Sequence, residues 1–96
     1  MEFEWDEDKR QINLVKHGVY FEDATLVFKD PNELTLPAKT VSGEARFKTI
    51  GRFGAKAILL VIHTRRDVHG EGFIIRMISA RPASRAERKR YERREF

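Results

Sequence analysis

An apolar run at residues 57–62, AILLVI, is the feature that most limits what this chain can fold into. The run is far too short to span a bilayer, which takes about 20 apolar residues in a helix. Gly54 and Ala55 precede it, and the polar sequence HTRR follows it. A short continuous apolar run with such borders is typical of a strand that is buried on both faces. We therefore expect residues 56–64 to form the central strand of a sheet.

Two further strands are predicted around this central one. Residues 45–53 alternate between an apolar side and a basic side. The basic side carries Arg46, Lys48 and Arg52. Residues 73–81 follow a glycine-containing turn at 67–72 and predict a third long strand. The simplest arrangement of the three is an antiparallel meander, and residues 34–36 are a candidate for one more strand.

Helices are predicted before these strands. Residues 3–5 indicate a short edge strand, after which Asp6 is a suitable N-cap for a helix over 7–17 that ends at Gly18. Apolar residues at helical spacing then predict a second, short helix over 21–28, which the sequence Asp30-Pro31 ends.

A third helix is expected near the end of the sequence. Ser84 and Glu87 match the S-x-x-E capping box, so the helix should begin at Arg85 and run to Phe96. The element order is then β-α-α-β-β-β-α, which defines an α+β fold. Because 96 residues leave no room for a second hydrophobic core, we expect residues 1–96 to be a single domain.

The charge is distributed unevenly along the chain. Residues 1–30 carry four Lys/Arg against eight Asp/Glu, whereas residues 31–96 carry fifteen against seven. Clustered Lys and Arg bind phosphates, so the later part is predicted to form a surface that binds a polyanion. The alternative is a solvated surface whose charge is merely uneven.

Several classes of protein are disfavoured by the composition. The chain has no cysteine, which excludes disulfides and thiolate metal sites and fits a reducing compartment. Three scattered histidines make a structural zinc site a poor interpretation, and we expect neither a metal nor a cofactor. The first residues are acidic where a signal peptide would be basic, so we expect a cytoplasmic protein without a membrane association.

Two long stretches of the sequence resemble the BrnT toxins. The opening FEWDEDKRQINLVKHGVYFEDATLVFKDP is similar to the N-terminal signature of that family, and IIRMISARPASRAERKRYE is similar to its closing strand and helix. The matching positions in the first stretch are Trp5, Asp6, Lys9, Asn13, Lys16, His17, Gly18, Phe21, Ala24, Phe28, Asp30 and Pro31. Those in the second stretch are Arg76, Ile78, Ser79, Ala80, Arg81, Ala83, Glu87, Arg88 and Tyr91.

The resemblance implies more than the residues alone do. It implies one BrnT-like toxin domain with a RelE-like fold: a small antiparallel sheet, two N-terminal helices and a C-terminal helix. It also implies an endoribonuclease that inhibits translation by cutting RNA. The implied partner is a BrnA-like ribbon-helix-helix antitoxin, through which alone the toxin would contact operator DNA. His63 departs from the family pattern, so no family role is carried over to it.

Metal-independent cleavage of RNA needs a base for the 2′-hydroxyl, cations for the phosphoryl oxygens and an acid for the leaving 5′-oxygen. Arginine suits the second task because its planar guanidinium binds phosphate in a bidentate way and stays charged. The candidate catalytic residues are Arg65, Arg76, Arg81 and Tyr91. The candidate RNA-binding residues are Arg46, Lys48 and Arg52.

Arg76 is the most specific of these candidates, since it is predicted to interrupt an apolar strand face formed by Ile74, Ile78 and Ala80. A charge in such a place needs a cleft or a carboxylate partner. The alternative is a structural salt bridge to an N-terminal acid or to Glu87.

Arg81 and Arg65 are predicted to end neighbouring strands, where the two guanidinium groups would grip one phosphate. The alternative is that both are simply solvated. Tyr91 follows Glu87 by one helical turn and is a candidate proton donor or stacking platform, or else an anchor for a weakly apolar helix. His63 has a suitable pKa range for a general base, but a structural histidine is the more common outcome.

Two other functions fit the same residues. A nucleic-acid-binding module without catalysis would use the basic strand and the basic last helix equally well. An interaction protein would use the acidic first third and the basic remainder to bind different partners.

Overall fold

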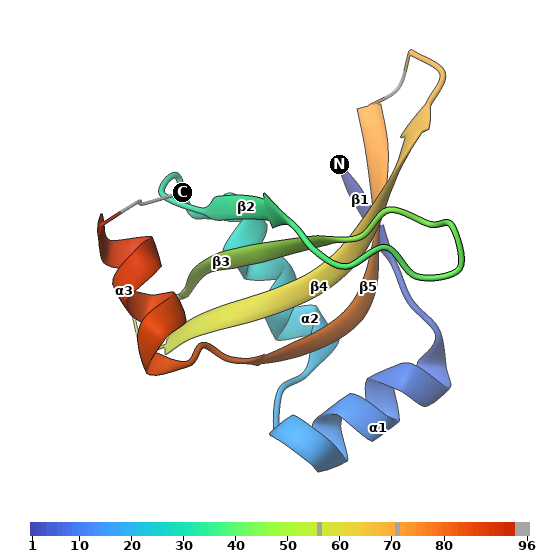
Figure 1. Cartoon of the computed structure of the whole chain (residues 1–96). Helices are drawn as coiled ribbons and strands as arrows, with labels where there is room; N and C mark the ends of the chain where they lie inside the picture. Colours follow the sequence, from blue (N-terminus) through green and yellow to red (C-terminus); the bar gives the residue numbers. More distant parts are fainter. Residues whose placement is uncertain (56, 71, 94–96) are drawn as a thin grey trace.

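The computed structural model describes residues 1–55, 57–70 and 72–93 and contains a five-stranded sheet in the order β1-β5-β4-β3-β2 (Figure 1). Neighbouring strands are antiparallel except β1, which runs parallel to β5. The elements in chain order are β1 (Glu2–Glu4), α1 (Glu7–His17), α2 (Phe21–Ala24), the 3₁₀ helix η1 (Thr25–Lys29), β2 (Leu34–Pro37), β3 (Phe47–Phe53), β4 (Ala57–Val68), β5 (Gly72–Pro82) and α3 (Arg85–Arg93).

The predicted α+β order is confirmed, and the candidate strand near residue 34 is β2. The largest differences from the predicted boundaries are in the second helix and in two strands. The second helix is divided into α2 and η1, β3 begins at Phe47, and β4 continues past Thr64 to Val68 because residues 64–68 pair with β5. The predicted ends at Lys56 and Phe96 lie outside the described residues.

β4 is buried on both faces, as the apolar run predicts. Leu59 and Val61 belong to a core cluster with Phe21 and Ala24 of α2 and Val27 of η1, and we name this side of the sheet the α1–η1 face. Leu60 belongs to a second cluster with Ile50 and with Tyr91 of α3, and we name that side the α3 face. Helices therefore cover parts of both sides of the sheet (Figure 1).

Close backbone packing on the α1–η1 face depends on Gly51 in β3. A Cβ atom at this position would lie 3.0 Å from both the Cβ and the carbonyl oxygen of Val27. Glycine thus lets η1 approach the sheet closely. Within the described residues, no helix is long and apolar enough to cross a membrane.

The caps of the helices follow the sequence signals. The Asp6 carboxylate accepts from the backbone N–H of Asp8 at 2.8 Å, and Gly18 ends α1 with a φ of 70°. In α3 the capping box is formed: the backbone N–H of Ser84 donates to Glu87 at 2.7 Å, and the backbone N–H of Glu87 donates to the Ser84 hydroxyl at 3.2 Å. These bonds satisfy donors that a helix start leaves free.

A β-bulge in β5 changes which residues share a face. Ile62 pairs with Ser79 and His63 pairs with Met77, so Ile78 is the extra residue. As a result Ala80 is buried in the core on the α1–η1 face. Arg76 is exposed and pairs with Thr64. The prediction that Arg76 shares an apolar face with Ala80 is therefore wrong, because the bulge shifts the alternation between them.

Asn13 fastens α1 to the open edge of β5 beside this bulge. Its side-chain amide donates to the carbonyl oxygens of Val19 at 3.0 Å and Ala80 at 2.9 Å, and its Oδ1 accepts from the backbone N–H of Ala80 at 2.9 Å. The side chain is buried, and it pairs with Ala80 in the way that a neighbouring strand would.

We predict that Asn13→Ala lowers the free energy of unfolding by about 3 kcal/mol, because it leaves buried backbone groups without partners. Urea denaturation measures the change. Gln11→Ala, on the exposed side of the same helix, is the matched control and should change stability by less than about 0.5 kcal/mol. Equal effects of the two substitutions would contradict the assignment.

Candidate active site

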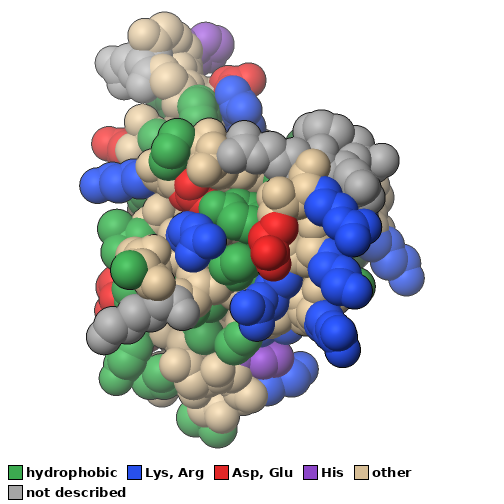
Figure 2. Space-filling model, turned by 90° about the vertical axis from the view of Figure 1, so that its left-hand side faces the viewer, with side chains coloured by type: hydrophobic (Ala, Val, Ile, Leu, Met, Phe, Trp, Pro, Cys, Tyr) green, Lys and Arg blue, Asp and Glu red, His purple; other side chains and the backbone are tan. Residues whose placement is uncertain are grey.

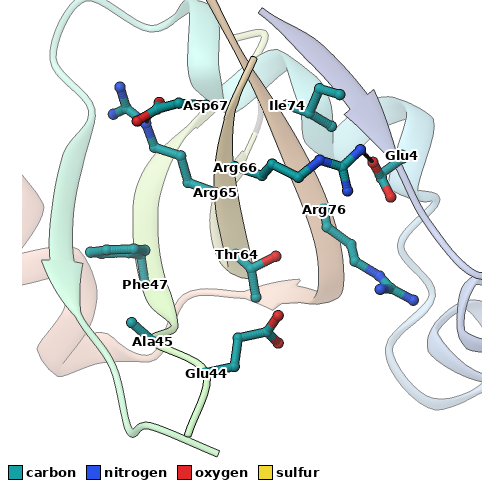
Figure 3. A pocket seen from close by; sticks show the side chains of 10 residues that line it. All are labelled: Glu4, Glu44, Ala45, Phe47, Thr64, Arg65, Arg66, Asp67, Ile74 and Arg76. Carbon is teal, nitrogen blue, oxygen red and sulfur yellow. Dashed lines mark hydrogen bonds and ion pairs between the residues drawn. The ribbon is translucent and has the colours of Figure 1, made fainter. Parts of the chain in front are cut away.

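The hairpin of β4 and β5 projects beyond the end of β3 and creates a hollow there. The β3–β4 ladder ends at the pair Phe47–His63, whereas β4 continues to Val68. A hollow of about 360 Å³ lies beside this projecting part, and loop residues Glu44 and Ala45 form its opposite wall (Figure 3). We name it the arginine hollow.

Three strands deliver side chains to the arginine hollow. Thr64 and Arg66 of β4 pair with Arg76 and Ile74 of β5, and Glu4 of β1 lies opposite Arg76 in register. Alternation along β4 places Thr64 and Arg66 on the α3 face together with Leu60. The charged groups therefore gather on the part of that face that lies past α3.

The two arginines of the hollow differ in their partners. The Nη2 of Arg66 lies 2.9 Å from Oε1 of Glu4, which orients the guanidinium across the hollow (Figure 3). Arg76 is exposed and forms no ion pair with any described residue. The predicted alternative, a salt bridge from Arg76 to Glu87 or an N-terminal acid, is not found among these residues. Its guanidinium is consequently available for an anion.

Carboxylates also border the arginine hollow. The side chain of Glu44 points into it toward Thr64, which is almost fully buried (Figure 3). The sequence reasoning missed Glu4, Glu44, Thr64 and Arg66. Arg66 stands in the polar sequence after the central strand, which is a weak signal. Glu44 lies in a loop that has no sequence signal for a site.

Arg65 lies at the rim of the hollow, on the opposite face of β4 from Arg66. Its guanidinium carbon is 3.9 Å from the centre of the Phe73 ring, and its Nε is 3.6 Å from Oδ1 of Asp67. Cation–π stacking of this kind holds an arginine in place but leaves its edge accessible.

Arg81 occupies a different region, against α3. Its Nη1 and Nη2 donate to the two carboxylate oxygens of Glu87 at 2.7 and 2.9 Å. The hydrogen bonds from Arg81 hold the pKa of Glu87 at about 2, although burial alone would raise it. Arg81 pairs with Leu60 and Arg65 pairs with Ile75, toward opposite ends of the hairpin. The prediction that Arg65 and Arg81 grip one phosphate is therefore wrong, since antiparallel pairing separates them.

Tyr91 is a buried anchor of α3. Its ring packs with Ile50 and Leu60, and its hydroxyl donates to the carboxylate of Asp30. Burial, together with the hydrogen bond to Asp30, raises the pKa of the phenol. This geometry matches the predicted anchoring role, while the role of proton donor stays a prediction.

The predicted basic side of residues 45–53 also carries a buried core residue. Lys48 and Arg52 share the α3 face with buried Ile50, and Arg46 lies just before β3 with a buried Nε. Arg52 adjoins α3, where Lys and Arg gather on the surface (Figure 2). We name the exposed group the α3 basic surface; its members are Arg52, Arg85, Arg88, Lys89 and Arg93.

His63 is a structural residue of the α1–η1 face. It is 3% exposed, its Nε2 lies 2.8 Å from Oγ1 of Thr49, and its ring stacks near Phe47 and meets Phe28 edge-on. Burial lowers the pKa of His63 to about 4, and a weaker backbone interaction with Thr64 acts in the opposite direction. The imidazole is thus neutral near pH 7. Among the described residues, no three His, Asp or Glu side chains are grouped to hold a metal ion.

The fold and the site define a small basic α+β protein whose arginine-lined hollow suits an anionic ligand, and sequence and structure comparisons specify the family. Residues 5–87 match the family described as the ribonuclease toxin BrnT of type II toxin-antitoxin systems. The crystal structure of the Brucella abortus ribonuclease toxin BrnT is 33% identical in sequence, with a TM-score of 0.66 over 88% of this chain and 99% of that one. No curated protein sequence gives a significant match.

The chain therefore belongs to the BrnT family of ribonuclease toxins of type II toxin-antitoxin systems. The resemblance drawn from its first and last stretches is confirmed. Membership in a type II system implies an antitoxin partner and an RNA substrate.

We predict that His63 makes stability depend on pH below neutrality. Between the unfolded pKa of 6.5 and the folded pKa of about 4, the unfolded chain binds a proton that the folded chain does not. Stability from neutral His63 is complete above pH 6.5 and declines as the pH falls toward 4. The loss between pH 7.5 and pH 5 is about 2 kcal/mol.

Urea denaturation of the parent and of His63→Gln at both pH values isolates this contribution. The variant should lose about 2 kcal/mol less than the parent on acidification. The control is His69→Gln, which replaces an exposed histidine in the turn between β4 and β5 and should behave like the parent. Parallel pH curves for the parent and His63→Gln would show that His63 is not buried in its neutral form.

Proposed function

We propose that this toxin is a metal-independent endoribonuclease whose cleavage site is the arginine hollow. The observation that carries the proposal is the position of Arg76: an exposed guanidinium with no ion-pair partner among the described residues, on a β-strand beside Arg66. A strand positions its side chains more precisely than a loop does, so a cation there is well placed for a phosphoryl group.

The proposed reaction needs no metal ion. The 2′-oxygen of the RNA loses its proton and attacks the adjacent phosphorus, the bond from phosphorus to the 5′-oxygen breaks, and a 2′,3′-cyclic phosphate forms. The 5′-oxygen that leaves takes its proton from solvent water and becomes a 5′-hydroxyl. Arg76 binds the phosphoryl oxygens, with Arg66 as a second cation that Glu4 keeps in place. Glu44 faces the same space and is the proposed base for the 2′-hydroxyl proton.

The α3 basic surface is the proposed path for the rest of the RNA strand. It adjoins the same face of the sheet and is solvated, so each contact with a phosphate adds modest affinity that salt weakens. The other candidate, a binding module without catalysis, is less well supported. The carboxylate of Glu44 would repel phosphate in simple binding, whereas acid–base chemistry requires such a group.

We further propose that cutting of cytoplasmic RNA by this chain inhibits translation, and that a ribbon-helix-helix antitoxin silences it. The positive charge of the α3 basic surface favours an acidic or amphipathic antitoxin segment as the covering element. In this proposal operator DNA is bound through the antitoxin, and the toxin has no DNA site of its own.

We predict that the purified toxin cleaves RNA in the presence of EDTA and leaves 2′,3′-cyclic phosphate or 3′-phosphate ends. The reason is that guanidinium groups supply the charge that a metal ion would otherwise supply. Mapping of RNA ends after incubation measures this outcome. Cleavage that disappears with chelator and returns with magnesium would overturn metal independence.

Replacing Arg76 should separate catalysis from folding. We predict that Arg76→Ala lowers the cleavage rate by about 100-fold or more, because one preorganised donor to the phosphoryl oxygens is lost. Its melting temperature should stay close to that of the parent, since the side chain is exposed. Single-turnover kinetics and thermal melting measure the two effects.

Lys48→Ala and Arg81→Ala are the comparison variants for Arg76→Ala. Lys48→Ala should weaken RNA binding only a few-fold and in a salt-dependent way. Arg81→Ala should lower the melting temperature, because Glu87 loses its bidentate partner. Full cleavage activity in Arg76→Ala would move the site away from the arginine hollow.

A further inference from the structure

A second hollow lies on the α1–η1 face, next to the arginine hollow. Its volume is about 140 Å³, and the rings of Phe28, Phe47 and Phe73 line it together with Ile75. We name it the aromatic hollow. A cavity of about 150 Å³ with apolar walls accepts a single six-membered aromatic ring. The aromatic hollow is therefore the size of one such ring.

The two hollows share walls at the projecting part of β4. Phe47 and Arg65 line both of them. Arg65 covers the Phe73 ring at 3.9 Å, so its charge stands at the junction. A ligand with a flat ring in one hollow and a phosphate in the other would follow this shared wall. A nucleotide has this construction.

Polar groups inside the aromatic hollow have unused hydrogen-bonding capacity. His63 is 97% buried, and its Nδ1 makes no hydrogen bond with any described residue. Glu33 is half-buried in the same wall, where its carboxylate accepts from the Thr35 hydroxyl at 3.3 Å. Burial raises the pKa of Glu33, and the bond from Thr35 acts against this. Such groups are placed to read the edge of a base rather than to line an empty apolar cavity.

We propose that the aromatic hollow binds the pyrimidine base of the nucleotide whose phosphate lies in the arginine hollow, and that Glu33 selects cytosine over uracil. Phenylalanine rings provide the stacking surfaces that protein sites use for unpaired RNA bases. The carboxylate of Glu33 accepts a hydrogen bond from the exocyclic amino group of cytosine, whereas the O4 of uracil has no proton to give it. This inference rests on the proposed function, since it assigns the substrate of the same site.

Binding of nucleoside monophosphates tests the inference without any cleavage. Cytidine 3′-monophosphate should bind about tenfold more tightly than uridine 3′-monophosphate, by calorimetry on the whole folded chain. In NMR spectra it should shift the signals of Thr35 and His63. Glu33→Gln should abolish or reverse the preference, because an amide group donates to O4 of uracil. Glu2→Gln, an exposed carboxylate on β1, should keep the preference of the parent.

Three results would overturn the inference: equal affinity for the two nucleotides, tighter binding of adenosine 3′-monophosphate, or signal shifts confined to α3. Thermal melting of Glu33→Gln verifies that its fold is kept. The outcomes for the two proposals are separable. A chain that prefers cytidine 3′-monophosphate but leaves RNA intact supports the base site and contradicts the ribonuclease proposal. A chain that cuts RNA without regard to the base supports the ribonuclease proposal and contradicts the base site.

Discussion

The burial of β4 on both faces is the constraint on which the rest of the structure depends. Leu59 and Val61 need cover on one side, which α2 and η1 provide, and Leu60 needs cover on the other, which α3 provides. Apolar cover is required only along the apolar run. Beyond it β4 continues with polar residues that need no helix above them, and Arg65, Arg66 and Asp67 are exposed there beside β5. The functional hollows therefore lie where the apolar run ends.

Some arginines of this chain are bound to carboxylates within the fold, and Arg76 is available for a ligand. Arg81 is bound to Glu87 and holds α3, while Arg66 is oriented by Glu4. The Arg81–Glu87 pair is bidentate and leaves Arg81 little charge for a phosphate, whereas a single bond to Glu4 fixes the position of Arg66. Arg76 has no ion-pair partner among the described residues, and the two predicted kinds of partner are paired with other arginines: Glu4 with Arg66 and Glu87 with Arg81. Its exposure, rather than burial in an apolar face, is what makes it suitable for an anion.

Local signals in the sequence predicted the elements well, since caps, periodicity and the apolar run each act over a few residues. The bulge at Ile78 was not predictable from the alternation of β5, and it reversed the side assigned to Ala80. The site was predicted only in part. Arg76 and Arg65 line the hollow, but the partners of Arg81 depend on antiparallel register, which sequence does not specify. Glu44 is placed in the site by the path of a loop. Loops have no periodic sequence pattern, so this position could not be predicted.

The central claim is that the RNA phosphate binds beside the projecting part of the β4–β5 hairpin. NMR titration with a 2′-O-methylated dinucleotide, which binds but has no 2′-hydroxyl to react, tests this most directly. The account predicts that the largest signal shifts fall on the backbone amides of Thr64, Arg66 and Arg76, with smaller shifts along α3. Shifts confined to the α3 basic surface, with unchanged signals at those three residues, would contradict it.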